Sequence, residues 1–467
     1  MEQHAQHDRR DRLRAAAAGA AVVLALLAGA APAQAAPGAG RAPAADADPA
    51  SASAPASASG PASASGPGGI DRRDLDRRLE AVHAAGMYGA YGSVRDGRGR
   101  WDGATGLADV ATGRPTAPGM RHRVGSVTKS FTAVAVLRQS AEGRIRLDRP
   151  VGDYLPGLVP GERGRKITVR MLLNHTSGIA DYIDEAFPSL KEGSAKSLDE
   201  FRYRTIAPDR LIRMGTDRPQ LFEPGTDWSY ANTNYLLLGE LLRKVTGEDP
   251  EKVITRDVIR PAGLRDTYFP GTDPRIRGPH ARMYESLYGL IDPPRDYGDF
   301  NMTMAGTAGA LVSTTGDLTT FYRALFQGKL LPAAQLREMR TTVPVKEADG
   351  SVVFRYGLGI YTMDTACGPV WGHDGMVFGA GTSALTSADG ERQYAVGYNL
   401  TKYQRFDANG APVPHPVDAA LGVLQDRALC PAPPDAARSA APAPAREPLD
   451  ARTSEGVRNA AAARSGQ

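Results

Sequence analysis

A serine and a lysine stand three residues apart in the stretch Val124-Gly125-Ser126-Val127-Thr128-Lys129-Ser130-Phe131. Apolar residues follow at helical spacing and predict a helix that begins at Ser126. Side chains three apart share a helix face, so Ser126 and Lys129 would meet. Burial disfavours the charged amine, and a neutral lysine can take the proton of a serine hydroxyl. The stretch therefore indicates a nucleophile beside its base. The alternative is a capping serine followed by an exposed lysine.

A second polar motif lies in Trp228-Ser229-Tyr230-Ala231-Asn232-Thr233-Asn234-Tyr235. Tyr230 and Asn232 are two residues apart, so on an extended segment they face the same way. A phenol near a lysine ammonium could ionise and act as a general base, although its free pKa is about 10. Asn232 offers a donor and an acceptor and could orient the lysine or a substrate amide. Alone the motif is usually structural, but the rigid turn at 222–226 before it favours a functional interpretation.

A third motif follows in the late stretch Val370-Trp371-Gly372-His373-Asp374-Gly375-Met376. His373 could hold the tail of a substrate or assist the return of a proton. Gly375 would let a substrate backbone approach the strand closely. The backbone N–H of Met376 could join that of Ser126 in an oxyanion hole. Read alone, a histidine on a strand is more often structural.

The remaining pattern predicts strands near both ends of a folded region and helices between them. A helix starts at Asp71 and ends at Gly86, and a strand pair follows at 88–94 and 100–104. The middle, 141–317, is mostly helical and loop-like. Strands return at 356–361, 370–372, 380–387 and 394–399. The expected fold is α/β of the α+β type: one antiparallel sheet built from both chain ends, flanked by helices, with a mostly helical subdomain.

Both ends of the chain differ in composition from the middle. Residues 1–35 combine early arginines, an apolar run and Ala33-Gln34-Ala35, which predicts a signal peptide and a secreted protein. The alternative is a membrane anchor. Residues 36–69 are almost only Ala, Pro, Ser, Gly and Asp, and residues 431–467 are similarly poor in apolar periodicity. We expect a disordered linker and a disordered tail around a catalytic domain at 70–430.

Composition excludes several other classes of protein. The formal net charge of +4 gives no reason to expect nucleic acid as a partner. We find no metal-binding pattern and no nucleotide loop, so no metal or cofactor is expected. The apolar run of the signal peptide is the one candidate membrane span, and none is expected after its removal. The two cysteines, Cys367 and Cys430, predict one disulfide in an exported protein, with two free thiols as the alternative.

The three motifs, in this order, resemble the active-site elements of the serine penicillin-recognising family. This family holds class C β-lactamases, soluble D-alanyl-D-alanine carboxypeptidases, and related esterases and D-amino-acid peptidases. The stretches 151–156, 167–179 and 308–314 also resemble this branch, and the likeness covers about 70–430. It implies a β-lactamase/DD-peptidase-like fold in which Ser126 is acylated, and in which Lys129 and Tyr230 share the proton transfers. Asn232, His373, Gly375 and Met376 would then bind the substrate.

The resemblance is more specific for the family than for the substrate. The histidine at position 373 is typical of the soluble carboxypeptidases, since β-lactamases usually have lysine there. Asp374, however, stands where family members that bind a C-terminal carboxylate commonly have Thr or Ser. An ionised Asp374 in the cleft would repel such a substrate, unless strand alternation turns it away. His175 is expected to be a packed or hydrogen-bonded structural residue, and Asp181 and Tyr182 to border the cleft without taking part in catalysis.

The sequence thus predicts a secreted serine hydrolase that works through an acyl-enzyme. The first interpretation is a D-alanyl-D-alanine carboxypeptidase-like enzyme of peptidoglycan peptides that also reacts with β-lactams. Alternatives are a class C-like β-lactamase, an esterase, or a D-amino-acid amidase or peptidase. Outside enzymes, the chain could be a β-lactam or peptidoglycan sensor. The expected partners are a small peptide or β-lactam substrate and cell-wall peptidoglycan, and the protein is expected to be a monomer.

Overall fold

The computed structural model describes residues 69–347, 349–407 and 412–430. The predicted signal peptide, all but the last residue of the predicted linker, and the predicted tail lie outside these ranges. Within them, no helix combines the length and the apolar character that crossing a membrane requires.

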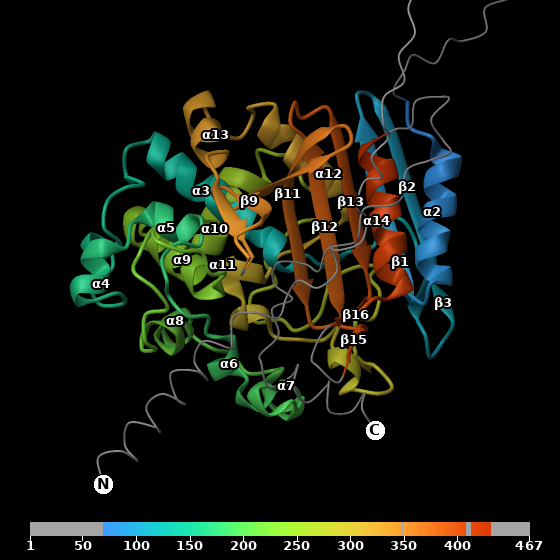
Figure 1. Cartoon of the computed structure of the whole chain (residues 1–467), viewed down its shortest axis with the longest axis horizontal. Helices are drawn as coiled ribbons and strands as arrows, with labels where there is room; N and C mark the ends of the chain where they lie inside the picture. Colours follow the sequence, from blue (N-terminus) through green and yellow to red (C-terminus); the bar gives the residue numbers. More distant parts are fainter. Residues whose placement is uncertain (1–68, 348, 408–411, 431–467) are drawn as a thin grey trace, which may run out of the picture. The chain divides into compact units, whose positions relative to one another are not determined.

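The centre of the described chain is an antiparallel sheet with the strand order β3-β2-β1-β13-β12-β11-β10-β9-β8 (Figure 1). Strands from the start of the domain pair directly with strands from its end, because β1 lies beside β13. The prediction of one sheet built from both ends is therefore confirmed. The strands are β1 (Gly89–Asp96), β2 (Gly99–Asp109), β3 (Arg114–Pro115), β8 (Val343–Lys346), β9 (Val352–Tyr356), β10 (Tyr361–Thr365), β11 (Gly368–Val377), β12 (Ala380–Ser387) and β13 (Arg392–Tyr398).

Smaller sheets of two or three short strands lie outside this sheet, and helices fill the middle of the chain. The short strands are β4 (His122–Arg123) with β7 (Val312–Ser313), β5 (Tyr284–Glu285) with β6 (Arg295–Asp296) and β14 (Leu400–Thr401), and β15 (Arg405–Phe406) with β16 (Pro412–Val413). The helices are α2 (Arg72–Ala84), α3 (Thr128–Ala141), α4 (Gly161–Lys166), α5 (Val169–Leu173), α6 (Ile183–Ala186), α7 (Lys196–Phe201), α8 (Pro208–Thr216), α9 (Asn232–Thr246), α10 (Pro250–Ile254), α11 (Gly306–Gly309), α12 (Thr315–Phe326), α13 (Ala333–Met339) and α14 (Pro416–Leu429). Single turns are η1 (Gly125–Val127), η2 (Val151–Asp153), η3 (Pro188–Glu192), η4 (Thr255–Ile259), η5 (Leu287–Gly289) and η6 (Met302–Met304).

The sheet separates two hydrophobic cores. Successive side chains of a strand point to opposite faces, and β13 follows this rule. Tyr394 and Val396 pack in one core with Leu79 of α2 and Leu424 of α14. Ala395, between them, belongs to the larger core built by the other helices. Figure 1 shows α2 and α14 side by side over β1 and β13. The helix of the first motif, α3, lies in the larger core, whereas Tyr230 of the second motif packs in the smaller one.

Helix α3, which carries the S-x-x-K motif, runs through the middle of this larger core. Nearly all of its residues are buried, polar ones included. A helix that is buried on every side needs partners for its polar side chains. Thr132 Oγ1 donates to Thr307 O at 2.7 Å, and Thr128 Oγ1 accepts from Leu311 N at 3.2 Å. These bonds tie α3 to the segment around α11, which lies 170 or more residues further along the chain.

The structure corrects the predicted strand at 356–361. β9 ends at Tyr356 and β10 begins at Tyr361, and a turn joins the two strands. In this turn Gly359 has a φ of 76°, which favours glycine, and Gly357 N donates to Ile360 O at 2.7 Å. The structure also adds α14 and β8, which the sequence pattern did not predict, and extends the third motif's strand to the full length of β11.

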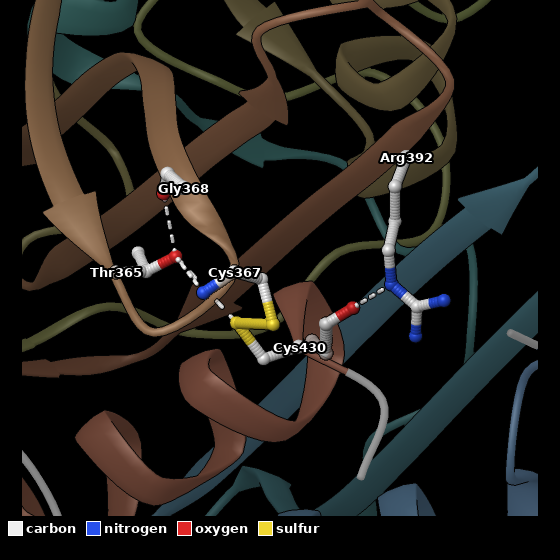
Figure 2. Close-up of a disulfide and its surroundings, with 6 residues drawn as sticks. Thr365, Cys367, Gly368, Arg392 and Cys430 are labelled. Carbon is white, nitrogen blue, oxygen red and sulfur yellow. Dashed lines mark hydrogen bonds between the residues drawn. A yellow bond between two sulfur atoms is a disulfide. The ribbon is translucent and has the colours of Figure 1, made fainter. Parts of the chain in front are cut away.

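The predicted disulfide joins Cys367, in the turn between β10 and β11, to Cys430 at the end of α14 (Figure 2). The two cysteines are 63 residues apart in the sequence. Thr365 Oγ1 holds the turn by donating to Gly368 O at 2.7 Å and accepting from Cys367 N at 3.2 Å. Nearby, Arg392 Nε donates to Ala428 O at 2.5 Å. The bridge thus fastens α14 to the sheet.

We expect the double substitution Cys367→Ser and Cys430→Ser to lower the free energy of unfolding by about 2–4 kcal/mol, because the unfolded chain regains the entropy of an open loop. Urea denaturation of both proteins measures this effect through the denaturation midpoints. Turnover per folded molecule should stay unchanged, since the bridge lies outside the active-site motifs. Equal midpoints for the two proteins would show that the bridge contributes no stability.

Candidate active site

Three hydrogen bonds surround the amine of Lys129, which is completely buried. Its Nζ lies 2.8 Å from Ser126 Oγ, 2.7 Å from Asn232 Oδ1 and 2.8 Å from the carbonyl oxygen of Ala308. These partners come from η1, from the first turn of α9 and from α11. The structure therefore brings the first two sequence motifs together and adds the backbone carbonyl of Ala308, which no side-chain pattern could reveal.

The types of atoms around Lys129 decide where its lone pair points. The oxygen atoms of Ala308 and of the Asn232 amide can only accept hydrogen bonds. A neutral amine has two N–H groups, and donating these to the two carbonyl-type oxygens leaves the lone pair for the hydroxyl of Ser126. Burial disfavours the charged form of the amine. The arrangement can thus take a proton from Ser126 and return it along the same 2.8 Å contact.

The second motif is shaped by His175, which packs against Tyr230. His175 has a φ of 64° and is fully buried, and its ring centroid lies 4.3 Å from that of Tyr230. Ser229 N donates to the His175 carbonyl at 3.0 Å, and Ala231 N donates to His175 Nδ1 at 3.2 Å. Both neighbours of Tyr230 in the chain are therefore fixed by one histidine, as the expected structural role requires. The Tyr230 ring centroid lies 4.8 Å from Lys129 Nζ.

The third motif lies directly against the turn that carries Ser126. A Cβ on Gly125 would stand 2.6 Å from Met376 N, and one on Gly375 would stand 1.9 Å from Val124 O and 2.9 Å from Ser126 N. Gly125 also has a φ of 52°, which favours glycine. Only residues without a side chain permit this close approach. It brings the backbone around Ser126 and Met376 together, as a pair of oxyanion-hole donors would require.

His373 is placed beside Tyr230 but is fully buried. The ring centroids of the two residues are 6.3 Å apart. His373 Nδ1 lies 2.5 Å from the carbonyl of Asp374, and Nε2 lies 2.9 Å from the hydroxyl of Tyr356. Burial lowers the pKa of His373 to about 3, so the ring is neutral. A hydrogen bond from His373 to a substrate would require one of these two contacts to break.

Asp374 is half-buried and occupies the next position on β11. Because His373 faces Tyr230, strand alternation directs Asp374 to the opposite face of the sheet. Burial raises the pKa of both Tyr322 and Tyr394, and the charge of Asp374 raises each further. The carboxylate therefore lies near buried tyrosines, and repulsion of a substrate carboxylate in the cleft is not expected.

We expect Asp374→Thr to change kcat/KM by less than about threefold, both for a peptide with a free C-terminal carboxylate and for its C-terminal amide. The reason is the orientation of Asp374 away from Tyr230. Steady-state assays with an N-acyl-D-alanyl-D-alanine peptide and the matching amide measure the two values. A rise for the carboxylate substrate alone would place Asp374 in the cleft and contradict this assignment.

Asp181 contacts Asn232, although the sequence motifs indicated no part in catalysis for it. Its Oδ2 accepts from the backbone N of Asn232 at 3.0 Å and from Asn232 Nδ2 at 2.8 Å. No spacing rule links Asp181 to Asn232, so the sequence offered no signal for this contact. Tyr182, by contrast, is buried and donates its hydroxyl to Met304 O. In the described ranges, no three His, Cys, Asp or Glu side chains gather to hold a metal ion.

Comparisons with known proteins agree with this geometry. A family model described as Beta-lactamase matches residues 72–413. The solved structure of a D-stereospecific amidohydrolase from Streptomyces sp. is similar with 38% sequence identity and a TM-score of 0.67, over 77% of this chain and 99% of that chain. Esterase EstB of Burkholderia gladioli is 32% identical over 214 residues, which are 44% of this chain and 54% of the esterase. A D-aminopeptidase of Cereibacter sphaeroides is 28% identical over 342 residues, 71% of this chain and 60% of that protein.

The chain thus spans between half and two thirds of these two curated relatives, and nearly the whole length of the Streptomyces structure. The match to the family model includes all three motifs and the buried serine–lysine pair. The predicted fold is confirmed by the same likeness. The chain therefore belongs to the beta-lactamase family and is a serine hydrolase.

Proposed function

We propose that this enzyme hydrolyses amide bonds of D-amino-acid derivatives through an acyl-enzyme on Ser126. The observation that carries the catalytic part is the contact of 2.8 Å between Lys129 Nζ and Ser126 Oγ inside a buried set of acceptors. The substrate class is supported by the likeness to a D-stereospecific amidohydrolase over 99% of that chain. The D-aminopeptidase relative supports the same class.

Acylation begins when Ser126 Oγ attacks the carbonyl carbon of the substrate. The hydroxyl proton passes to the neutral amine of Lys129 as the new C–O bond forms. The carbonyl oxygen becomes an oxyanion, for which the backbone N–H groups of Ser126 and Met376 are the proposed donors. The C–N bond then breaks, and the departing amine receives a proton from Lys129, with Tyr230 as the proposed carrier. The product is an ester of Ser126 and a free amine or ammonia.

Deacylation repeats these steps with water in place of serine. Water gives a proton to the neutral amine of Lys129 and attacks the ester carbonyl. The tetrahedral intermediate collapses, the C–O bond to Ser126 breaks, and the proton returns to Ser126 Oγ. The enzyme is restored, and the released acid completes the hydrolysis. Asn232 and Ala308 keep Lys129 in place during both halves, since both of their oxygen atoms accept from its Nζ.

A substrate panel tests the proposal. It contains D- and L-phenylalaninamide, a short acyl ester, N-acetyl-D-alanyl-D-alanine and a cephalosporin. We expect the highest kcat/KM for the D-amide and little turnover of its L-enantiomer. Preference for the ester, or equal turnover of the two enantiomers, would contradict the D-amidase proposal and favour an esterase. Rapid cephalosporin hydrolysis would favour a β-lactamase. A lasting adduct without turnover of any substrate would indicate a sensor.

A D-alanyl-D-alanine carboxypeptidase is the second candidate. The observation that favours it is the histidine at the start of the third motif, His373-x-Gly375, as in the soluble carboxypeptidases that this sequence resembles. Peptidoglycan peptides would then be the natural substrates. Release of D-alanine from N-acetyl-D-alanyl-D-alanine at a higher kcat/KM than that of the D-amide would support this candidate over the first.

We also propose that the protein is secreted and acts as a monomer. The support for secretion is the composition of residues 1–35 together with the disulfide Cys367–Cys430, which suits an oxidising compartment. Expression of the full chain in a secreting bacterial host, followed by N-terminal sequencing of the protein in the medium, tests this. A start near residue 36 is expected, and retention in the membrane with an intact N-terminus would indicate an anchor. Light scattering measures the mass of the protein in solution, and the mass of one chain is expected for a monomer.

A further inference from the structure

The side-chain amide of Asn232 could occupy its site in two orientations that have nearly the same shape. In the observed orientation, Oδ1 accepts from Lys129 Nζ at 2.7 Å and Nδ2 donates to Asp181 Oδ2 at 2.8 Å. An ionised carboxylate has no hydrogen to donate, so it can face only the NH2 end of an amide. Asp181 therefore selects which end of Asn232 meets Lys129.

A reversed amide would change the chemistry at Lys129. It would direct an N–H group at the amine, and the lone pair of a neutral Lys129 would accept from that group. The same lone pair is needed for the proton of Ser126, whose Oγ lies 2.8 Å away. Reversal would thus deprive the nucleophile of its base, although every residue of the three motifs would still be present.

Asp181 is itself held in a fixed position. Its Oδ1 accepts from Ile183 N at 3.1 Å, at the first residue of α6, and its Oδ2 also accepts from Asn232 N at 3.0 Å, at the first residue of α9. Three donors thus converge on one partly buried carboxylate. Burial raises its pKa, and the hydrogen bonds from Asn232 and Ile183 oppose this shift.

We propose that Asp181 is a positioning residue for acylation, which holds the Asn232 amide so that its oxygen rather than its nitrogen faces Lys129. This inference rests on the proposed role of Lys129 as the base for Ser126. Asp181 acts through Asn232 and not on the substrate. Its loss should therefore lower the rate of acylation and leave substrate binding unchanged.

Single-turnover acylation by p-nitrophenyl acetate tests the proposal in folded variants. Asp181→Ala should lower the limiting rate roughly 10²-fold, the loss expected from a misplaced catalytic group, with the half-saturating ester concentration unchanged. Asp181→Asn keeps an oxygen that can face both donors of Asn232, so its acylation rate should lie within roughly tenfold of the wild-type rate. The matched control is Asp184→Asn. Asp184 is also half-buried, and among the described residues no hydrogen bond joins it to Asn232 or Lys129; wild-type acylation is expected.

A second measurement is independent of any substrate. In wild-type protein the side-chain amide protons of Asn232, assigned by their loss in Asn232→Asp, should exchange slowly with water in NMR spectra. They should exchange rapidly in Asp181→Ala. Wild-type acylation in Asp181→Ala, or equal losses in Asp181→Ala and Asp184→Asn, would overturn the proposal.

If Asp181→Ala does not fold, Asp181→Asn decides the question. A rate loss beyond 10²-fold while the amide protons stay protected would overturn the proposal, and a mild loss with protected protons supports it. If wild-type protein is not acylated at all, the role of Ser126 fails. Exchange of the Asn232 protons then still shows whether Asp181 holds the amide.

Discussion

Ser126→Ala is expected to lower turnover roughly 10⁶-fold, the effect seen when a catalytic serine is removed from a hydrolase of this kind of chemistry. Ser126 is the hydroxyl that Lys129 Nζ approaches to 2.8 Å, and no acyl-enzyme can form without it. Intact-protein mass spectrometry after mixing with p-nitrophenyl acetate reports the adduct directly. We expect the mass of one acetyl group on wild-type protein and none on the variant. Its melting temperature should stay close to that of wild type.

The matched control for this experiment is Ser130→Ala, four residues further along. Ser130 is fully buried, and its hydroxyl donates to Gly359 O at 2.7 Å and lies 2.9 Å from the hydroxyl of Tyr322. This substitution should cost about 1 kcal/mol of stability and leave the adduct in place. An acetyl group on the Ser126→Ala protein at the wild-type rate would show that another residue is the nucleophile.

The sequence alone was sufficient for the parts of the site that depend on local spacing. Ser126 and Lys129 share one helical turn, so their contact follows from helix geometry. The pairing of β1 with β2 around the turn 96–99 was likewise readable, because alternation and glycine mark a hairpin. That Tyr230 and Asn232 approach Ser126 and Lys129 was predicted from the resemblance of the motifs. Spacing alone says nothing of contacts between residues more than 100 positions apart.

The contacts that were missed share a physical cause. Ala308 contributes through its backbone oxygen, and any residue type would offer the same atom there. Asp181 reaches Asn232 across 51 residues, and carboxylates in loops are common. His373 was expected to serve the substrate, but the tyrosine that its Nε2 meets, Tyr356, lies on a neighbouring part of the sheet. In each case the partner is decided by tertiary packing.

The prediction of one strand at 356–361 was wrong for a related physical reason. Tyr356, Leu358, Ile360 and Tyr361 are all buried, and their alternation with small residues reads as a strand. Gly359, at a φ of 76°, instead lets the chain reverse, and the apolar side chains are buried in the two hydrophobic cores. Apolar alternation shows which residues are buried, whereas glycine at positive φ decides whether the chain continues.

Lys129→Met is expected to lower the acylation rate roughly 10⁴-fold, at the upper end of what a general base contributes. Methionine has similar length and suits a buried site, so the change removes the amine with little loss of volume. Asn232 Oδ1 and Ala308 O would each lose a donor, which should lower stability by about 1–3 kcal/mol per group. Stopped-flow acylation by p-nitrophenyl acetate measures the rate below the melting temperature of both proteins.

A second buried lysine separates the loss of a base from the loss of a buried amine. Lys402 is 8% exposed and lies 2.9 Å from the carboxylate of Glu285. Lys402→Met leaves Glu285 without this partner and should cost about 3–5 kcal/mol of stability, yet the folded fraction should acylate at the wild-type rate. Acylation of Lys129→Met within tenfold of wild type would remove the amine from the mechanism. Of the two lysines, only Lys129 lies within hydrogen-bonding distance of Ser126. An equal rate loss in both variants would therefore assign the effect to a disturbed protein interior and not to the loss of a base.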